Sequence, residues 1–267
     1  MLDEYILKLF GIIIGAIFFH EKCDKGKFRM DKLNLEAIKV FYDSIENVWP
    51  RNNAWYSYLK SRIETYIRKN YNQLDNAYIL NAGSGGNDYG IISNNMYHVD
   101  IAKDKIAHLK NATVASIEDL PFPDEMFDYS ICVGSVLNYC DAIASISEMA
   151  RVLKRQGRLI LEFENSHSFE YLGKSVYGNS AEIVTTKYLE QSHKLWVYSF
   201  DYIRSILKEY SFDIRNSSAL HVLSGLLLNK KYDENTAAKL AKFDRIFQYI
   251  PYFKKRASNI ILLCEKL

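Results

Sequence analysis

The sequence predicts a doubly wound α/β fold, in which helices cover both faces of a mostly parallel sheet. Two observations support this prediction. An apolar run at 78–82 ends in Gly83, Gly85 and Gly86, as a buried parallel strand does where it enters a tight turn before a helix. Beyond Asp100, segments with strand and helix periodicity alternate as far as 162.

The glycine turn and Asp100 together predict a binding site for an adenosine. Glycines lack the Cβ atoms that would hold a ligand away from the backbone, and the helix that follows has unpaired N–H groups. Asp100 closes a second apolar run, and a carboxylate there can accept hydrogen bonds from both hydroxyls of a ribose. A dinucleotide fits poorly, because a G-x-G-x-x-G pattern counted from Gly83 ends at Asp88, where a carboxylate would meet the pyrophosphate.

Composition favours one domain with additions. At 267 residues with 48% hydrophobic content, the chain can bury a single substantial core. The net charge of +2, without a dense arginine stretch, gives no indication of nucleic-acid binding. The four cysteines show no C-x-x-C spacing, and no other metal-ligand spacing is visible, so a reduced, cytoplasmic setting without a metal is expected.

The first segment, 1–33, is an apolar N-terminal extension. Its run at 9–19 is too short to span a bilayer as a helix, which takes about 20 residues, and the acidic Asp3 and Glu4 do not fit a signal peptide. We favour a helix packed on the body of the protein; a shallow membrane contact through 5–19 is the alternative. A biological translation start at Met30 is a third reading of the segment.

Residues 34–72 predict two helices that form an N-terminal lid. Apolar residues at steps of three and four indicate a helix at 35–49, which Pro50 ends, and a second helix at 54–69. The later elements follow from periodicity and from the capping residues Asp141 and Ser199. They are strands at 96–99, 113–116, 129–133, 158–162, 212–223 and 259–264, and helices at 103–109, 142–153, 200–210 and 235–249.

The last of these helices lies in a basic helical insertion at 230–256. Lysines and arginines accompany its apolar stripe. A lid helix with a solvated basic face is the simplest interpretation, and contact of 235–256 with an anionic membrane or an anionic substrate is the alternative.

Three segments resemble the class I S-adenosylmethionine-dependent methyltransferases. The most specific is L-P-F-P-D-E-M-F-D at 120–128, which resembles the L-P-F-P-D-x-x-F-D signature of small-molecule methyltransferases. The glycine turn at 83–87 and the run E-M-A-R-V-L-K-R-Q-G at 148–157 are similar to two further family motifs. The resemblance covers 35–267 and is closest from 78 to 162. It implies a Rossmann-like sheet of seven strands in the order 3-2-1-4-5-7-6, with strand 7 antiparallel.

The same resemblance implies S-adenosylmethionine as the cofactor. Adenine is expected against the Ile117 N–H, the Ser116 hydroxyl and Ile101. Tyr42, on the aromatic lid helix, more often serves packing in such proteins than gating. The complete set of expected cofactor contacts is Tyr42, Asn81, Ala82, Gly83, Ser84, Gly85, Asp88, Asp100, Ile101, Ser116, Ile117, Glu118, Val133, Gly134 and Ser135.

Several positions depart from the family pattern. Asn81 stands where the family has an acid, and Asn87 replaces the third glycine; Asp88 is the candidate for the charge that Asn81 lacks. Ser116 stands where an acid usually binds the adenine amino group, and Gln156 replaces a glycine. These departures motivate an alternative function, a non-catalytic regulatory protein that binds S-adenosylmethionine or a nucleoside. A nicotinamide-dependent oxidoreductase ranks third.

A substrate cap is predicted at 165–197, because long loops at the carboxyl edge of a sheet often carry binding residues. The expected substrate contacts are Asn138, Tyr139, Tyr171 and Trp196. The candidate general base is His167, then His193, with Tyr177 to orient the acceptor. The expected reaction is methyl transfer to an O or N atom of a small molecule, such as a lipid-like compound, a glycan or a secondary metabolite. No oligomeric state follows from the sequence.

Overall fold

A computed structural model describes residues 33–71 and 76–267. The predictions about the N-terminal extension at 1–32, including the start at Met30, therefore lie outside the described residues. Within the described ranges, the chain forms one compact unit from Leu33 to Leu267.

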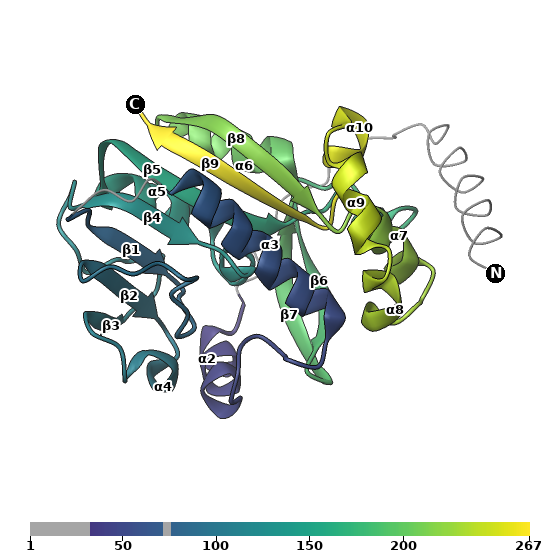
Figure 1. The fold of residues 1–267 in the computed structure, drawn as a ribbon, viewed down its shortest axis with the longest axis horizontal. Helices are drawn as coiled ribbons and strands as arrows, with labels where there is room; N and C mark the ends of the chain where they lie inside the picture. The colour runs from purple at the N-terminus through teal and green to yellow at the C-terminus, as the bar shows by residue number, and fades with distance from the viewer. Residues whose placement is uncertain (1–32, 72–75) are drawn as a thin grey trace. The chain divides into compact units, whose positions relative to one another are not determined.

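The main sheet has seven strands in the order β3-β2-β1-β4-β5-β9-β8 (Figure 1). The first five strands in this order are parallel, whereas β9 runs antiparallel to both of its neighbours. Since β8 and β9 are the sixth and seventh strands of the predicted sheet, the predicted order and the single antiparallel strand are confirmed. The strands are β1 Ile79–Ala82, β2 Met96–Asp100, β3 Ala112–Val114, β4 Phe127–Cys132, β5 Leu153–Glu164, β8 Phe212–Leu220 and β9 Asn259–Lys266.

Helices cover both faces of this sheet, as a doubly wound fold requires (Figure 1). Apolar residues of α5 and α6 pack in one core cluster, and those of α3 pack in a second cluster on the other face. Side chains of Asn34, Asn53, Asp141 and Ser199 cap α2, α3, α5 and α6. The helices are α2 Leu35–Ser44, α3 Ala54–Asn70, α4 Lys103–Ile106, α5 Ala142–Val152, α6 Phe200–Glu209, α7 Leu223–Asn229, α8 Glu234–Ala238, α9 Ala241–Phe247 and α10 Pro251–Lys254.

Three predicted helices differ from the structure, and the one predicted at 103–109 ends at Ile106. The first lid helix ends at Ser44, because Ile45 is already extended, so the residues up to Pro50 form a loop. The helix predicted at 235–249 is divided into the short helices α8 and α9. In the lid helix and in the divided helix, the apolar periodicity of the sequence continues past the residue at which the backbone leaves the helix, so periodicity alone did not predict the helix ends.

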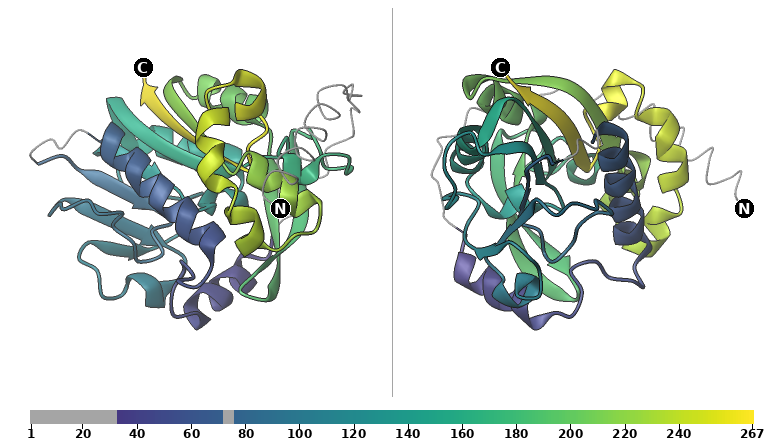
Figure 2. Two further views of the ribbon diagram at one scale, coloured as in Figure 1. Left: turned by 45° about the vertical axis from the view of Figure 1, so that its right-hand side comes forward. Right: turned by 60° about the vertical axis from the view of Figure 1, so that its left-hand side comes forward.

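The segment predicted as a loop-like cap contains regular structure. After the 3-10 helix η2 (Phe169–Tyr171), β6 (Ala181–Tyr188) and β7 (Gln191–Tyr198) form an antiparallel hairpin that extends from the main sheet toward α2 (Figure 2). Its turn residues Leu189 and Glu190 have φ values of 49° and 61°, as a two-residue hairpin turn requires. The turn lacks the usual Gly or Asn, so the sequence gives no hairpin signal there.

An arginine connects the two family-like motifs outside the glycine turn. The Arg151 guanidinium donates hydrogen bonds to the carbonyls of Leu120 (2.9 Å) and Phe122 (2.7 Å). It also donates to the carboxylates of Asp124 (2.9 Å) and Glu148 (2.7 Å), and Glu148 accepts from the Leu120 N–H at 2.8 Å. The proline-containing turn at 120–124 is therefore fixed by the end of α5.

We predict that Arg151→Met lowers the free energy of unfolding by about 2 kcal/mol, since it leaves the partly buried carbonyls of Leu120 and Phe122 without a donor and removes the cation that pairs with Glu148. Arg204→Met is the matched control, because Arg204 makes an exposed pair with Asp201 and an exposed contact with the Phe200 ring, so its loss should cost less than about 0.5 kcal/mol. Urea denaturation of both variants measures the difference. Equal losses would contradict the role of the Arg151 clamp.

Candidate functional site

A cavity lies at the carboxyl ends of β1, β2, β4 and β5, where the ligand sites of parallel sheets occur. The strand order places the ends of β1 and β2 on one side of it and the end of β5 on the other. We name the first side the glycine side; it includes Gly83, Ser84, Gly85, Asp100, Ile101, Ser116 and Ile117. We name the second the glutamate side; it includes Tyr56, Tyr139, Glu164, Glu170, Tyr188, Leu228 and Glu234.

On the glycine side, the turn and Asp100 are bonded to each other directly. The Asp100 carboxylate accepts from the N–H groups of Gly85 and Ala102, each at 2.8 Å. Burial raises the pKa of Asp100, and these backbone donors lower it. Gly83 has a φ of 71°, and a Cβ there would lie 2.3 Å from a methyl carbon of Val136, so only glycine fits this position.

Other predicted cofactor residues on this side divide into those that line the cavity and those that do not. Ser116 and Ile117 line it, together with Val133, Gly134 and Ser135. The Ser116 hydroxyl accepts from the Glu118 N–H at 3.1 Å, whereas the Ile117 N–H donates to no residue of the described ranges. Glu118 is outside the lining and accepts from the N–H of Asp141 at 2.6 Å.

Asn81 and Asp88 are placed differently from the prediction. Asn81 is 1% exposed, and its amide donates to the carbonyl of Asn87 at 2.6 Å, which closes the glycine turn from behind. Asp88 is exposed and accepts from the Gly90 N–H at 2.8 Å. Neither residue lines the cavity, and neither does the fully buried Ala82. The structure does not bring the Asp88 charge to the position at which Asn81 lacks one, because the turn directs Asp88 outward.

A buried carboxylate that the sequence analysis missed organises the loop after β4. The N–H groups of Gly134 and Ser135 donate to one oxygen of Glu162 at 2.8 and 2.7 Å, and the amide of Asn259 donates to the other oxygen at 2.7 Å. Both loop residues have positive φ, 83° and 59°. Burial raises the pKa of Glu162, which has no accessible surface. An acid inside the apolar run of β5 was the available signal.

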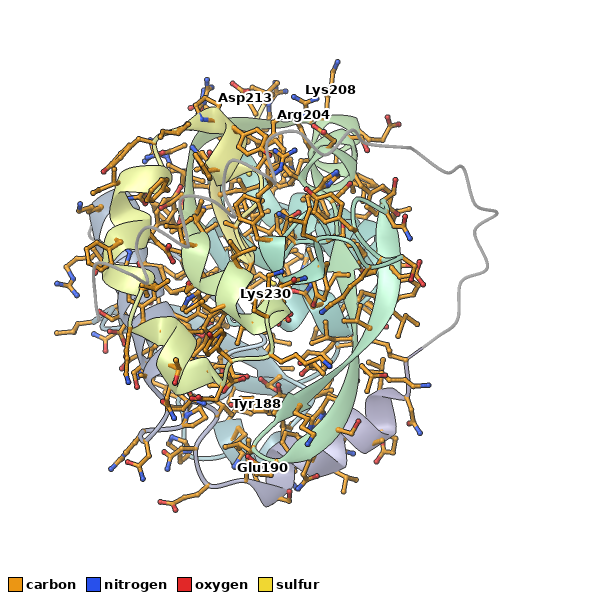
Figure 3. All side chains as sticks on the ribbon, turned by 90° about the vertical axis from the view of Figure 1, so that its right-hand side faces the viewer. Tyr188, Glu190, Arg204, Lys208, Asp213 and Lys230 are labelled. Carbon is orange, nitrogen blue, oxygen red and sulfur yellow. The ribbon has the colours of Figure 1, made fainter. Side chains whose placement is uncertain are left out.

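The segment between α2 and α3 forms a cover over the cavity. The Lys105 ammonium donates to the carbonyl of Ile45, and the Tyr188 hydroxyl donates to the carbonyl of Val48. Trp49 lies against Gly134, where a Cβ would be 3.2 Å from the indole ring. Tyr188 stands just before the hairpin turn, close to Glu190 at its tip (Figure 3). The hairpin and α4 thus hold the cover from opposite directions.

The predicted substrate residues are only partly brought together. Tyr139 lines the cavity beside Tyr42, with ring centroids 5.8 Å apart. Asn138 has no accessible surface; its amide accepts from the Glu164 N–H at 2.9 Å and donates to the Glu164 carbonyl at 3.2 Å. It therefore positions Glu164 rather than facing a substrate. Tyr171 and Trp196 do not line the cavity.

None of the three predicted catalytic residues lines the cavity. His167 and Tyr177 contact each other, with ring centroids 5.5 Å apart, on the segment before the hairpin. His193 packs edge-on against Phe41 at 4.1 Å, and burial lowers its pKa. The reason is the hairpin itself, which carries His193 to α2 and leaves His167 at its base.

Three glutamates that the sequence analysis did not select stand on the glutamate side instead. Burial first, and then the charge of Glu170, raise the pKa of Glu164 to about 8. Burial first, with a contribution from Glu234, raises the pKa of Glu170 to about 7. The pKa of Glu234 is also raised by burial, and its carboxylate accepts from Tyr56 at 3.1 Å. Across residues 33–71 and 76–267, no group of three or more His, Cys, Asp or Glu is arranged to hold a metal ion.

Residues 80–161, which contain the glycine turn, Asp100 and β5 as far as Leu161, match the family model of the methyltransferase domain. The chain carries a methyltransferase domain. It is accordingly an enzyme of the methyltransferase class, and its cofactor is S-adenosylmethionine.

Sequence relatives of this chain include one uncharacterized protein and one methyltransferase. An uncharacterized protein of Methanocaldococcus jannaschii is 26% identical over 246 residues, which are 84% of this chain and 92% of the relative. The ubiquinone/menaquinone biosynthesis C-methyltransferase UbiE of Rickettsia massiliae is 32% identical over 116 residues. That match covers 38% of this chain and 45% of UbiE, so it includes less than half of either protein.

Solved structures share the fold of this methyltransferase across most of the chain. The (4+2)-cyclase SpnF has a TM-score of 0.57 and 15% identity, and the similarity covers 90% of this chain and 99% of SpnF. The geranyl diphosphate C-methyltransferase of Streptomyces coelicolor has a TM-score of 0.53 and 11% identity, with 87% and 97% covered. The latter was solved with Mg²⁺, geranyl diphosphate and S-adenosylhomocysteine. At these identities, the two structures bear on the fold.

We predict that Asp100→Ala weakens the binding of S-adenosylmethionine at least about tenfold, because one or two ribose hydrogen bonds and the bond to the glycine turn are lost. Asp88→Ala is the matched control and should bind the cofactor as the unmodified chain does, since Asp88 is exposed and outside the cavity. Isothermal titration calorimetry measures both. An unchanged affinity in Asp100→Ala, with the fold intact by circular dichroism, would place the ribose elsewhere.

Proposed function

We propose that this methyltransferase moves a methyl group from S-adenosylmethionine to an O or N atom of a small molecule held on the glutamate side of the cavity. The single observation that carries the proposal is the continuity of the cavity. It extends from Asp100 on the glycine side, past Ser135 and Tyr139, to Glu164 on the other side. A donor and an acceptor can thus be held in one enclosed space.

The residues on the glycine side fit this cofactor. One Asp100 oxygen accepts a hydrogen bond from the Gly85 N–H and the other from the Ala102 N–H, and each retains a lone pair for a ribose hydroxyl. The unpaired Ile117 N–H can donate to adenine, with Ile101 in apolar contact. S-adenosylmethionine, when bound, supplies a methyl group already activated by its sulfonium.

The contribution of the chain is mainly alignment. Holding two reactants in the reactive geometry can lower a barrier by several kcal/mol, and exclusion of water strengthens the interactions inside. The cover formed by 45–50 and the aromatic residues Tyr42 and Tyr139 are suited to both tasks. Glu164 ends β5 and lines the cavity, and burial raises its pKa to about 8, so among the lining acids it is our candidate for taking a proton from the methyl acceptor.

Incubation of the full chain with methyl-labelled S-adenosylmethionine and an extract of small metabolites tests the proposal. We expect label in at least one small molecule, with S-adenosylhomocysteine formed in equal amount, and loss of both in Asp100→Ala. Cofactor binding without transfer to any fraction would instead support the alternative function, a protein that binds the cofactor without catalysis.

We also propose a shallow membrane contact through 235–256, which would suit a lipid-like acceptor. Exposed apolar side chains support it, among them Ile246 (66% exposed) and Tyr249 (80% exposed), with the exposed Lys239 and Lys255 in the same segment. In the part of the chain that the structure describes, no helix is both long and apolar enough to cross a bilayer.

Flotation with anionic phospholipid vesicles tests this contact. Ile246→Glu should reduce the bound fraction at least about fivefold, because it removes an exposed apolar side chain that would enter the membrane interface and adds repulsion from the anionic lipids. Ile92→Glu is the matched control: Ile92 is 90% exposed, but it lies between β1 and β2, far along the chain from the insertion. Absence of vesicle binding by the unmodified chain would remove the proposed contact and the lipid-like acceptor with it.

A further inference from the structure

We propose that the glutamate side recognises its small molecule through a protonated amine. This inference rests on the proposed function, since it assigns a chemical class to the acceptor of the same cavity. Three carboxylates from three separate elements line this side: Glu164 ends β5, Glu170 lies in η2, and Glu234 begins α8.

The Glu170 carboxylate needs a partner that the chain does not supply. It is partly buried and lines the cavity, yet no residue of the described ranges donates a hydrogen bond to it. Its main chain is fixed, because the Asn229 amide donates to the Glu170 carbonyl at 2.9 Å and the Ser168 hydroxyl accepts from its N–H at 3.0 Å. A partly buried carboxylate on a fixed backbone, facing a cavity and without a donor, is suited to a ligand that brings the donor.

The charges around Glu170 point to a cationic donor. The charges of Glu164 and Glu234 repel that of Glu170 and each other. The Lys174 ammonium attracts Glu170, but Lys174 lies outside the cavity lining, with its ammonium 5.4 Å from the centroid of the Tyr171 ring. Glu234 is hydrogen-bonded to Asn53 and Tyr56, and the Ser135 side chain lowers the pKa of Glu164 without offsetting the effect of burial. An ammonium would relieve the repulsion, whereas an anionic group would add to it.

Aromatic rings complete a cation site. Tyr42, Tyr56 and Tyr139 line the cavity with Tyr188, and the Tyr188 ring lies 5.1 Å from that of Tyr56 and 6.4 Å from that of Tyr42. The faces of such rings attract ammonium groups, and the attraction is larger where water is excluded. Burial keeps the pKa values of all four phenols above the ordinary value, so they stay neutral beside the glutamates.

A divalent cation that holds an anionic acceptor is the competing arrangement. It is disfavoured, because the described glutamates are not grouped to hold a metal ion. A single ammonium can interact with one or two carboxylates at a time and does not require the close convergence of ligands that Mg²⁺ does.

Three matched probes test the inference on the full chain saturated with S-adenosylhomocysteine. Tyramine, tyrosol and 4-hydroxyphenylacetate share one ring and chain length and end in an ammonium, a hydroxyl and a carboxylate. By calorimetry, tyramine should bind at least about tenfold more tightly than tyrosol, and 4-hydroxyphenylacetate should bind most weakly.

Glu170→Gln and Glu164→Gln should each remove most of the preference for tyramine while the affinity for S-adenosylhomocysteine stays unchanged. Glu182→Gln, at an exposed position of β6, is the control and should keep the preference.

The pH dependence of tyramine binding gives a second readout. With pKa values of about 8 and about 7, Glu164 and Glu170 are largely protonated at low pH and become ionised as the pH rises. Affinity should therefore increase between about pH 6 and about pH 8.5, and the two Gln variants should flatten this rise. The charged and titratable groups that face the pair are Glu162, Glu234, Lys174, Tyr42, Tyr56, Tyr139 and Tyr171.

Equal binding of the three probes, no binding of any of them, or tighter binding of 4-hydroxyphenylacetate would overturn the inference. Binding of inorganic pyrophosphate that requires MgCl₂ and is lost in Glu170→Gln would replace it with the metal arrangement. Failure of S-adenosylhomocysteine to bind would instead contradict the proposed function, so the two failures are distinguishable.

Discussion

The cavity depends on one buried carboxylate, Glu162, where β5 passes the end of β4. Removal of a carboxylate from water is costly unless its oxygens are fully hydrogen-bonded, and Glu162 accepts two backbone N–H groups and the Asn259 amide. Those bonds hold Gly134 and Ser135 in the left-handed conformation, which is unfavourable for Ser135 without such support. Because this loop lies between Asp100 and Glu164, its position sets the distance between the two sides of the cavity.

The carboxylates of the glutamate side oppose folding when they are ionised. Glu164 and Glu170 have folded-state pKa values above those of free glutamate, so the folded state binds their protons more tightly than the unfolded chain does. Their effect favours folding below the ordinary glutamate pKa and becomes unfavourable as the pH rises through about 7 to 8. Such a cost is typical of groups placed for binding rather than for stability, and a cationic ligand would offset it.

The most specific motif of the sequence serves the fold rather than the cavity. None of residues 120–128 lines the cavity, and the turn that they form is bonded to Arg151 and Glu148. Gln156, where the family has a glycine, adopts a φ of 62°, so the backbone keeps the glycine-like conformation with a different residue. The motif resemblance therefore predicted the sheet and its connections, and it did not predict the residues of the glutamate side.

The sequence by itself determined the alternation of strands and helices, the glycine turn and the pairing of that turn with Asp100, whereas the order of the strands came from the resemblance to the methyltransferase family. These features follow from periodicity and from residues close together in the chain, where backbone conformation is set locally. The grouping of Glu164, Glu170 and Glu234, and the exclusion of His167 and His193 from the cavity, were decided only by the tertiary structure. Glu170 and Glu234 are brought together by the packing of α7 against both η2 and α8, and His193 is carried away by a hairpin whose turn has no glycine. Contacts of that kind depend on how separate elements pack, which no local pattern encodes.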